Sequence, residues 1–168
     1  MPDLALDIPP LKNGDRLTRK EFERRYHAMP RLKKAELIEG TVFVPSPLHF
    51  EQHAKLRSLI MGWLATYWAA TPGVELADNA TLRLDADNEL QPDALLRLSE
   101  RAGGRSRVSR DDYLEGAPEL IVEIASTTAS RDLHDKRKVY RRSGVREYLV
   151  WRVREKRLLW FVLEDDDY

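Results

Sequence analysis

Two acidic residues stand inside apolar, strand-like stretches of this chain of 168 residues. Glu123 lies in the middle of "PELIVEIAS", and Asp93 follows Pro92 at the start of "PDALLRL". A buried, ionised carboxylate costs several kcal/mol unless it is protonated, paired with a cation or bound to a metal. Mg²⁺ suits sites of one or two carboxylates that waters and phosphate oxygens complete. The pattern indicates a metal site, although Asp93 as a turn cap and Glu123 as the partner of a core arginine stay open.

A lysine with the same kind of placement follows on a helix-like segment over residues 130–143. Its apolar stripe consists of Leu133, Val139 and Tyr140, and Lys136 falls inside that arc. An inward ammonium near the strand acid could orient or deprotonate a water and stabilise charge on a phosphate. The open alternative is a lysine whose stem covers apolar surface while its head stays in water.

Two histidines offer a further site. His49 and His53 stand four apart in "HFEQH", a spacing that can set two imidazoles on one helical face for Zn²⁺. The sequence fixes neither a third ligand nor a general base, so hydrogen bonding at the helix entry or a substrate-side role is favoured over a zinc site.

The composition narrows the class of protein. The 28 Lys and Arg residues balance 28 Asp and Glu residues, so global charge does not point to nucleic acid. Charge is uneven locally, because residues 131–157 hold eleven Lys or Arg against four Asp or Glu. Cysteine is absent, which excludes disulfides and thiolate chemistry. With no signal-like or membrane-spanning stretch, we expect a cytoplasmic protein that does not enter the membrane.

The segments that position these residues read as one domain over residues 17–168, after an irregular lead-in over residues 1–16. Thr18 caps a predicted helix over 19–27, "AELIEGTVFVPSP" predicts a hairpin, and apolar spacing over 50–70 predicts the longest helix. Strands are expected in "VELADNATLRL", "QPDALLRLSE", "ELIVEIAS", "REYLVWRV" and "RLLWFVLE", with a loop over 103–110. This order predicts an α/β fold, a mixed sheet flanked by helices.

Three stretches, "QPDALL", "ELIVEIAS" and "RDLHDKRKVYRRSGVREYLVW", resemble the Uma-two family of restriction endonucleases in the PD-(D/E)XK nuclease superfamily. The resemblance runs from about Thr18 to Leu163 and includes the hairpin. It implies a restriction-endonuclease-like core with an N-terminal helix and hairpin. It also implies an endonuclease that uses Mg²⁺ or Mn²⁺ to hydrolyse phosphodiester bonds, with DNA as the expected substrate.

The resemblance also assigns roles to residues. It places the metal on Asp93 and Glu123 and adds Glu36 as a third acid, with Glu39 as its competitor. The superfamily has a lysine two residues after the second acid, where this chain has Ala125, and Lys136 is the matching residue. Accessory roles are implied for His53 and Tyr140, and nucleic-acid contacts for Arg137, Arg141 and Arg142.

Two functions remain open at this point. One is a metal-dependent nuclease. The other is a catalytically inactive domain of nuclease fold that binds nucleic acid or protein, which the neutral charge and the missing strand lysine favour. Four tryptophans and exposed strand edges make a homodimer an expectation for either function.

Overall fold

The computed structural model describes residues 8–45, 53–125 and 132–168. Its helices are α1 (Arg19–His27), α2 (Lys55–Ala70) and α4 (Arg137–Ser143), with the 3₁₀ turn η2 (Glu100–Ala102) and the π-helical turn η3 (Asp132–Lys136). Its strands are β1 (Glu36–Ile38), β2 (Thr41–Phe43), β3 (Val74–Ala77), β4 (Leu82–Arg83), β5 (Glu89–Leu90), β6 (Ala94–Leu98), β7 (Arg107–Val108), β8 (Leu114–Glu115), β9 (Leu120–Ala125), β10 (Glu147–Arg152) and β11 (Arg157–Val162). None of the helices in these ranges is long and apolar enough to span a bilayer.

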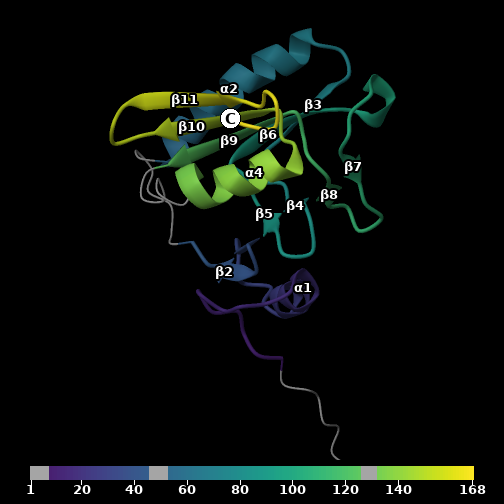
Figure 1. Cartoon of the computed structure of the whole chain (residues 1–168), viewed down its shortest axis with the longest axis vertical. Helices are drawn as coiled ribbons and strands as arrows, with labels where there is room; N and C mark the ends of the chain where they lie inside the picture. Colours follow the sequence, from purple (N-terminus) through teal and green to yellow (C-terminus); the bar gives the residue numbers. More distant parts are fainter. Residues whose placement is uncertain (1–7, 46–52, 126–131) are drawn as a thin grey trace, which may run out of the picture.

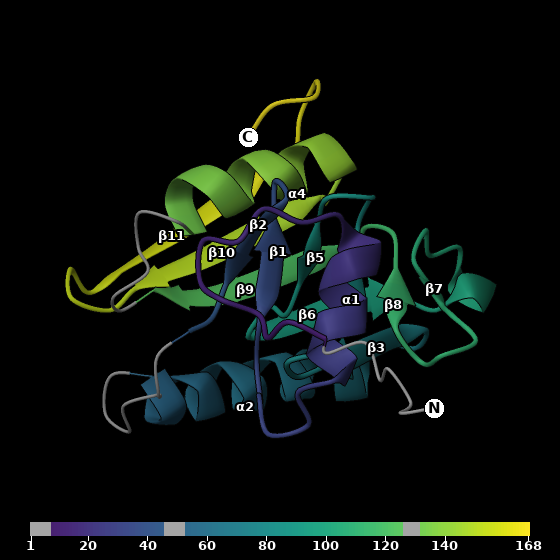
Figure 2. The same cartoon turned by 90° about the horizontal axis from the view of Figure 1, so that it is seen from below.

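A five-stranded sheet forms the centre of the molecule, in the order β11-β10-β9-β6-β3. The pair β9 and β10 is parallel, and the other neighbours are antiparallel. α4 covers one face of this sheet and α2 the other (Figures 1 and 2). The predicted mixed sheet between helices is therefore confirmed.

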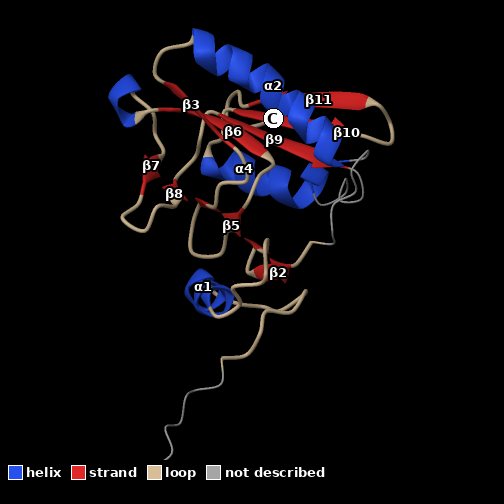
Figure 3. Cartoon of the chain, turned by 180° about the vertical axis from the view of Figure 1, so that it is seen from behind, coloured by secondary structure: helices blue, strands red, loops and turns tan. Residues whose placement is uncertain are grey.

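A second sheet of short strands lies on the α4 side, in the order β2-β1-β5-β4-β8-β7. α1 packs on the β1–β2 hairpin, where Phe22 joins Leu37 and Val42 in a small core of its own. In Figure 3 this sheet and α1 lie below the five-stranded sheet. The sequence did not predict β7, because we expected a loop over 103–110.

Local sequence signals explain the ends of the first elements. Thr18 accepts a hydrogen bond from the backbone N–H of Glu21 and so caps α1, as predicted. The β1–β2 turn has positive φ at Glu39 (51°) and Gly40 (70°), the geometry of a type I′ hairpin turn. The predicted hairpin is confirmed, and its turn fixes which hairpin side chains face the central sheet.

β9 is buried along its whole length, which explains its nearly continuous apolar sequence. Ile121 and Ala125 belong to the core on the α4 side, whereas Val122 and Ile124 belong to the core on the α2 side. Alternation therefore turns Glu123 toward α4 and the small sheet.

Candidate active site

Asp93 and Glu123 lie opposite each other on neighbouring strands. β6 and β9 are antiparallel with Ala94 opposite Val122, and one further step of this register brings Asp93 across from Glu123. Both side chains are buried, at 4% and 3% exposure. The register thus sets two carboxylates on one face of the sheet, at the place where the small sheet meets it.

Lys136 reaches this pair from the helix that covers the same face. It ends the π-helical turn η3, immediately before α4. Its ammonium Nζ lies 2.8 Å from Glu123 Oε1, and the hydroxyl of Tyr140, one turn later, donates to the same oxygen at 3.0 Å. π-helical turns often occur at functional sites, because they shift side chains out of the regular helical arc.

The third carboxylate comes from the N-terminal hairpin. Glu36 begins β1, and its Oε1 lies 2.9 Å from Lys136 Nζ and accepts a hydrogen bond from the backbone N–H of Gln91 at 3.0 Å. Lys136 therefore bridges Glu36 and Glu123, which are 87 positions apart in the chain. Burial opposes ionisation of Glu36, but the ammonium groups of Lys136 and Lys34 hold its pKa below the ordinary value.

Asp93 has its own set of partners. Its Oδ2 accepts a hydrogen bond from the backbone N–H of Ile124 at 2.8 Å and lies 3.3 Å from His53 Nε2, while Lys34 Nζ lies 3.9 Å from Oδ1. Burial would raise the pKa of Asp93, but His53, Lys34 and the Ile124 N–H together lower it to about 2. Asp93 is therefore an anion throughout the neutral range.

The lowered pKa makes a prediction about acid stability. Relative to an unfolded value of 3.8, ionised Asp93 contributes about 2 kcal/mol to folding above pH 4, and this is lost as pH falls through about 2. From about pH 5 to about pH 3, wild type should therefore lose about 1 kcal/mol more than Asp93→Asn. Urea unfolding in metal-free buffer measures both curves. Parallel curves would show that the Asp93 pKa is ordinary.

The donor chemistry of the cluster fits a hard divalent cation. All three acids offer oxygen ligands, and Glu36 and Asp93 are held ionised. Within the described residues, no group of three or more His, Asp or Glu side chains is placed to hold an ion by itself. Mg²⁺ usually takes only one or two carboxylates and completes its shell with water and substrate phosphate.

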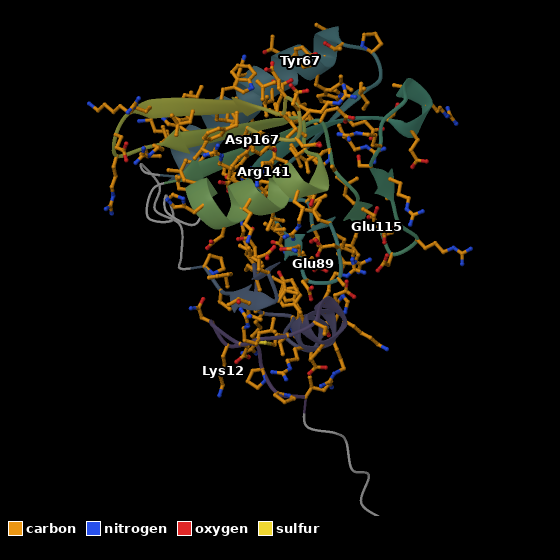
Figure 4. All side chains as sticks on the ribbon, viewed as in Figure 1. Lys12, Tyr67, Glu89, Glu115, Arg141 and Asp167 are labelled. Carbon is orange, nitrogen blue, oxygen red and sulfur yellow. The ribbon has the colours of Figure 1, made fainter. Side chains whose placement is uncertain are left out.

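The remaining predicted residues lie in different places. Glu39 turns away from the cluster and pairs with Arg142 at 2.6 Å. Arg141 pairs with Asp167, beside it in Figure 4, and the guanidinium of Arg137 lies 4.4 Å above the ring of Phe161. The three candidate nucleic-acid contacts thus have partners within the chain. His49 lies outside the described residues, so the pairing with His53 has no structural description.

A second set of charged side chains lies outside the cluster, grouped around the buried Arg83 of β4. Arg83 lies within 3.5 Å of carboxylate oxygens of Glu23, Glu89 and Asp111. Burial and the neighbouring carboxylate of Glu23 raise the pKa of Glu89 to about 8. Figure 4 places Glu89 below the central sheet, near α1. Because these groups pair with one another, we assign them to the stability of the small sheet.

Sequence reasoning missed two groups that support the cluster. Lys34 contributes positive charge beside Asp93, and the backbone N–H of Gln91 fixes Glu36. Gln91 stands two positions before Asp93 in "QPD", but nothing in its residue type shows that its backbone would face the hairpin. Both contacts depend on how β1 and β5 pair, which the sequence did not predict.

The chain is similar to known proteins in both sequence and fold. Residues 19–168 match the model of the Uma2 family, described as "Putative restriction endonuclease". A crystal structure of a putative nuclease belonging to DUF820 from Anabaena variabilis superposes with a TM-score of 0.66 at 13% identity, over 84% of this chain and 79% of that one. No curated protein matches the chain. The restriction-endonuclease-like fold is thereby confirmed, and the family match supports a nuclease role.

Proposed function

This chain belongs to the Uma2 (Uma-two) family, and from that premise we propose that it is a metal-dependent endonuclease that hydrolyses phosphodiester bonds in DNA. One observation carries the proposal. The side chains of Glu36, Glu123 and Lys136 come from β1, β9 and η3 and meet within hydrogen-bond distance, with Asp93 opposite Glu123. A fold needs no such convergence of buried charges for stability, because well-packed apolar residues serve as well or better.

Asp93 and Glu123 would hold the ion, as oxygen ligands on adjacent strands. When bound, the ion supplies positive charge at the scissile phosphate and makes a bound water more acidic. Mg²⁺ and Mn²⁺ both suit an all-oxygen site. Glu36 would act through Lys136, whose Nζ it contacts at 2.9 Å.

Lys136 would be the residue that orients the attacking water. Its Nζ is held by Glu36 at 2.9 Å and Glu123 at 2.8 Å, so its direction is fixed before substrate binds. An ammonium so placed can orient a water or hydroxide and stabilise charge that develops on the phosphate. The strand position that carries the superfamily lysine is Ala125, which is buried in apolar surroundings, and Lys136 brings an ammonium to the same face of β9 from the helix.

Metal titration tests the proposal first. Calorimetric titration of Mg²⁺ and Mn²⁺ should show binding to wild type, and Asp93→Asn and Glu123→Gln should weaken it by more than the ~10–100-fold that loss of an outer contact costs. Glu100→Gln, an exposed acid on η2, is the matched control and should bind as wild type does. Cleavage of supercoiled plasmid should follow the same ranking, with circular dichroism to confirm folding of each variant.

The inactive alternative makes the opposite prediction. If wild type binds neither ion, with or without added DNA, Glu123 is a structural partner of Lys136 and the chain is a binding domain of nuclease fold. If it binds both ions and cleaves RNA but not DNA, the mechanism stands and the substrate assignment is wrong.

A further inference from the structure

The strand β11 forms an unprotected edge of the central sheet. It is the outermost strand (Figure 1), and among the described strands it pairs only with β10. Its sequence, RLLWFV, contains neither proline nor lysine, and none of its residues has a positive φ. In natural proteins, proline, lysine or a bulge usually keeps an edge strand from pairing with another chain. Without them, the free N–H and C=O groups of the edge are available for such pairing.

The free backbone groups and the exposed apolar side chains of β11 belong to the same residues. Leu163 N–H donates to the carbonyl of Arg146, directly opposite, at 2.8 Å, which makes that pair a hydrogen-bonded one. Alternation along the strand then turns the N–H and C=O of Leu158, Trp160 and Val162 toward the open edge. Their side chains are 49%, 52% and 49% exposed.

The exposed stripe on β11 continues onto α2. The rings of Trp160 and Trp63 meet edge to face at 6.1 Å, and the indole N–H of Trp160 donates to Glu147 at 2.8 Å. Leu59 and Tyr67 lie one turn on either side of Trp63 along α2, and all three are about half exposed. Figure 4 labels Tyr67 on that helix, near the top of the view. An exposed surface of this kind marks an interaction site more often than a plain solvent face.

We propose that β11 pairs antiparallel with β11 of a second copy of this chain across a two-fold axis at Trp160. Residues opposite each other in an antiparallel pair share a face of the sheet. The exposed side chains of β11 in one copy therefore lie beside the same exposed side chains of the other copy. Centred on Trp160, the pairing sets Leu158 against Val162 of the other copy and Trp160 against itself. This register satisfies every outward-facing backbone group of the three residues.

Charge at the two ends of the strand favours a second copy over another partner. The turn before β11 carries Arg154 and Lys156, and the turn after it carries Glu164 and Asp166. Antiparallel pairing about Trp160 lays the basic end of one copy along the acidic end of the other, which supports association and fixes its direction. A two-fold contact also closes on itself, so two copies complete it.

The proposed dimer interface does not reach the carboxylate cluster. Val150 of β10 lies between Glu123 of β9 and Leu159 of β11, so the cluster is two strands in from the edge. The dimer therefore does not depend on the proposed nuclease function, and its test does not use cleavage.

Sedimentation velocity of the full chain tests the interface. Wild type should sediment as a dimer, and Trp160→Glu should be a folded monomer, because it places like charges face to face at the two-fold axis. Val108→Glu is the matched control, since Val108 is 53% exposed on β7, and it should remain dimeric. A monomeric wild type, or a Trp160→Glu variant that stays dimeric, would overturn the proposal, as would open-ended oligomers of wild type.

Cysteine cross-linking tests the register while keeping Trp160. The chain has no cysteine, so introduced thiols report only on themselves. In Leu158→Cys/Val162→Cys, opposed Cα atoms would be about 5.5 Å apart, within the ~4.4–6.8 Å range of disulfides, and mild oxidation should give a covalent dimer. Leu158→Cys alone should not cross-link, since the two thiols would be ~14 Å apart along the strands. Efficient cross-linking by the single variant, or none by the double variant, would refute this register.

Discussion

Lys136→Met is expected to lower metal-dependent cleavage of DNA by at least ~10²-fold, the lower end of what a positioned acid–base group contributes. The Nζ of Lys136 bonds to Glu36 and Glu123 at 2.9 and 2.8 Å, so methionine keeps the stem but removes the ammonium that we propose orients the water. Binding of Mg²⁺ should persist, because Asp93 and Glu123 remain. Single-turnover cleavage of plasmid, with calorimetric Mg²⁺ titration beside it, measures the two separately.

The same variant should also be less stable. Removal of Lys136 leaves two buried carboxylates, Glu36 and Glu123, without their shared cation, and a broken buried pair costs about 3–5 kcal/mol. A ligand that binds only the folded state stabilises it, so added Mg²⁺ should restore part of the loss if the proposed site holds the ion. Urea unfolding with and without Mg²⁺ measures this effect.

Lys138→Met supplies the control for both experiments. Lys138 lies on the same helix but is exposed, so its loss should change neither stability nor cleavage appreciably. Undiminished cleavage by Lys136→Met, with Lys138→Met unchanged, would remove Lys136 from the mechanism. Equal losses in the two variants would point to a general effect of helix charge on DNA binding.

The inward direction of Glu123 and Lys136 was predictable because each depends on local periodicity alone. Strand alternation separated Glu123 from Val122 and Ile124, and the helical arc of Val139 and Tyr140 contained Lys136. Both side chains are buried, as predicted. Their contact with each other was only an expectation, since it also requires η3 to cross the end of β9.

The sequence alone could not decide whether Glu36 or Glu39 is the third acid of the site. Both stand in "ELIEG", and alternation does not decide which of them faces a sheet whose position is unknown. In the structure Glu39 occupies the positive-φ position of a tight turn, whereas Glu36 sits in β1 where β5 approaches. The resemblance named Glu36, and only the tertiary arrangement supplies a physical reason.

The short strands and the arginine partners could not be predicted, for a common physical reason. β5, β7 and β8 have two residues each, too few to show a period. Arg142 pairs with Glu39, 103 positions away, and Arg141 with Asp167, 26 positions away. Such contacts follow from the assembled fold, so a basic stretch in the sequence did not reveal which of its charges are already neutralised.

Glu36→Gln should separate a positioning role from a structural one. Glutamine keeps an oxygen that can accept from the N–H of Gln91 and from Lys136 Nζ, but it removes the negative charge. The ammonium of Lys136 would then be held less firmly, and a misplaced group of this kind costs about 10²-fold in rate. We expect cleavage to fall by that factor, with little change in affinity for Mg²⁺.

The pH dependence of cleavage makes this test specific. In Glu36→Gln the Lys136 ammonium loses one of its neighbouring carboxylates, so its pKa should fall. The alkaline limb of the pH–rate profile should therefore move to lower pH. Glu39→Gln, in the same hairpin, removes an acid that pairs with the exposed Arg142 instead of Lys136, and it should keep the wild-type profile. If Glu36→Gln slows cleavage without moving the alkaline limb, Glu36 merely stabilises the hairpin. If Glu39→Gln moves the limb instead, the third acid of the site has been wrongly assigned.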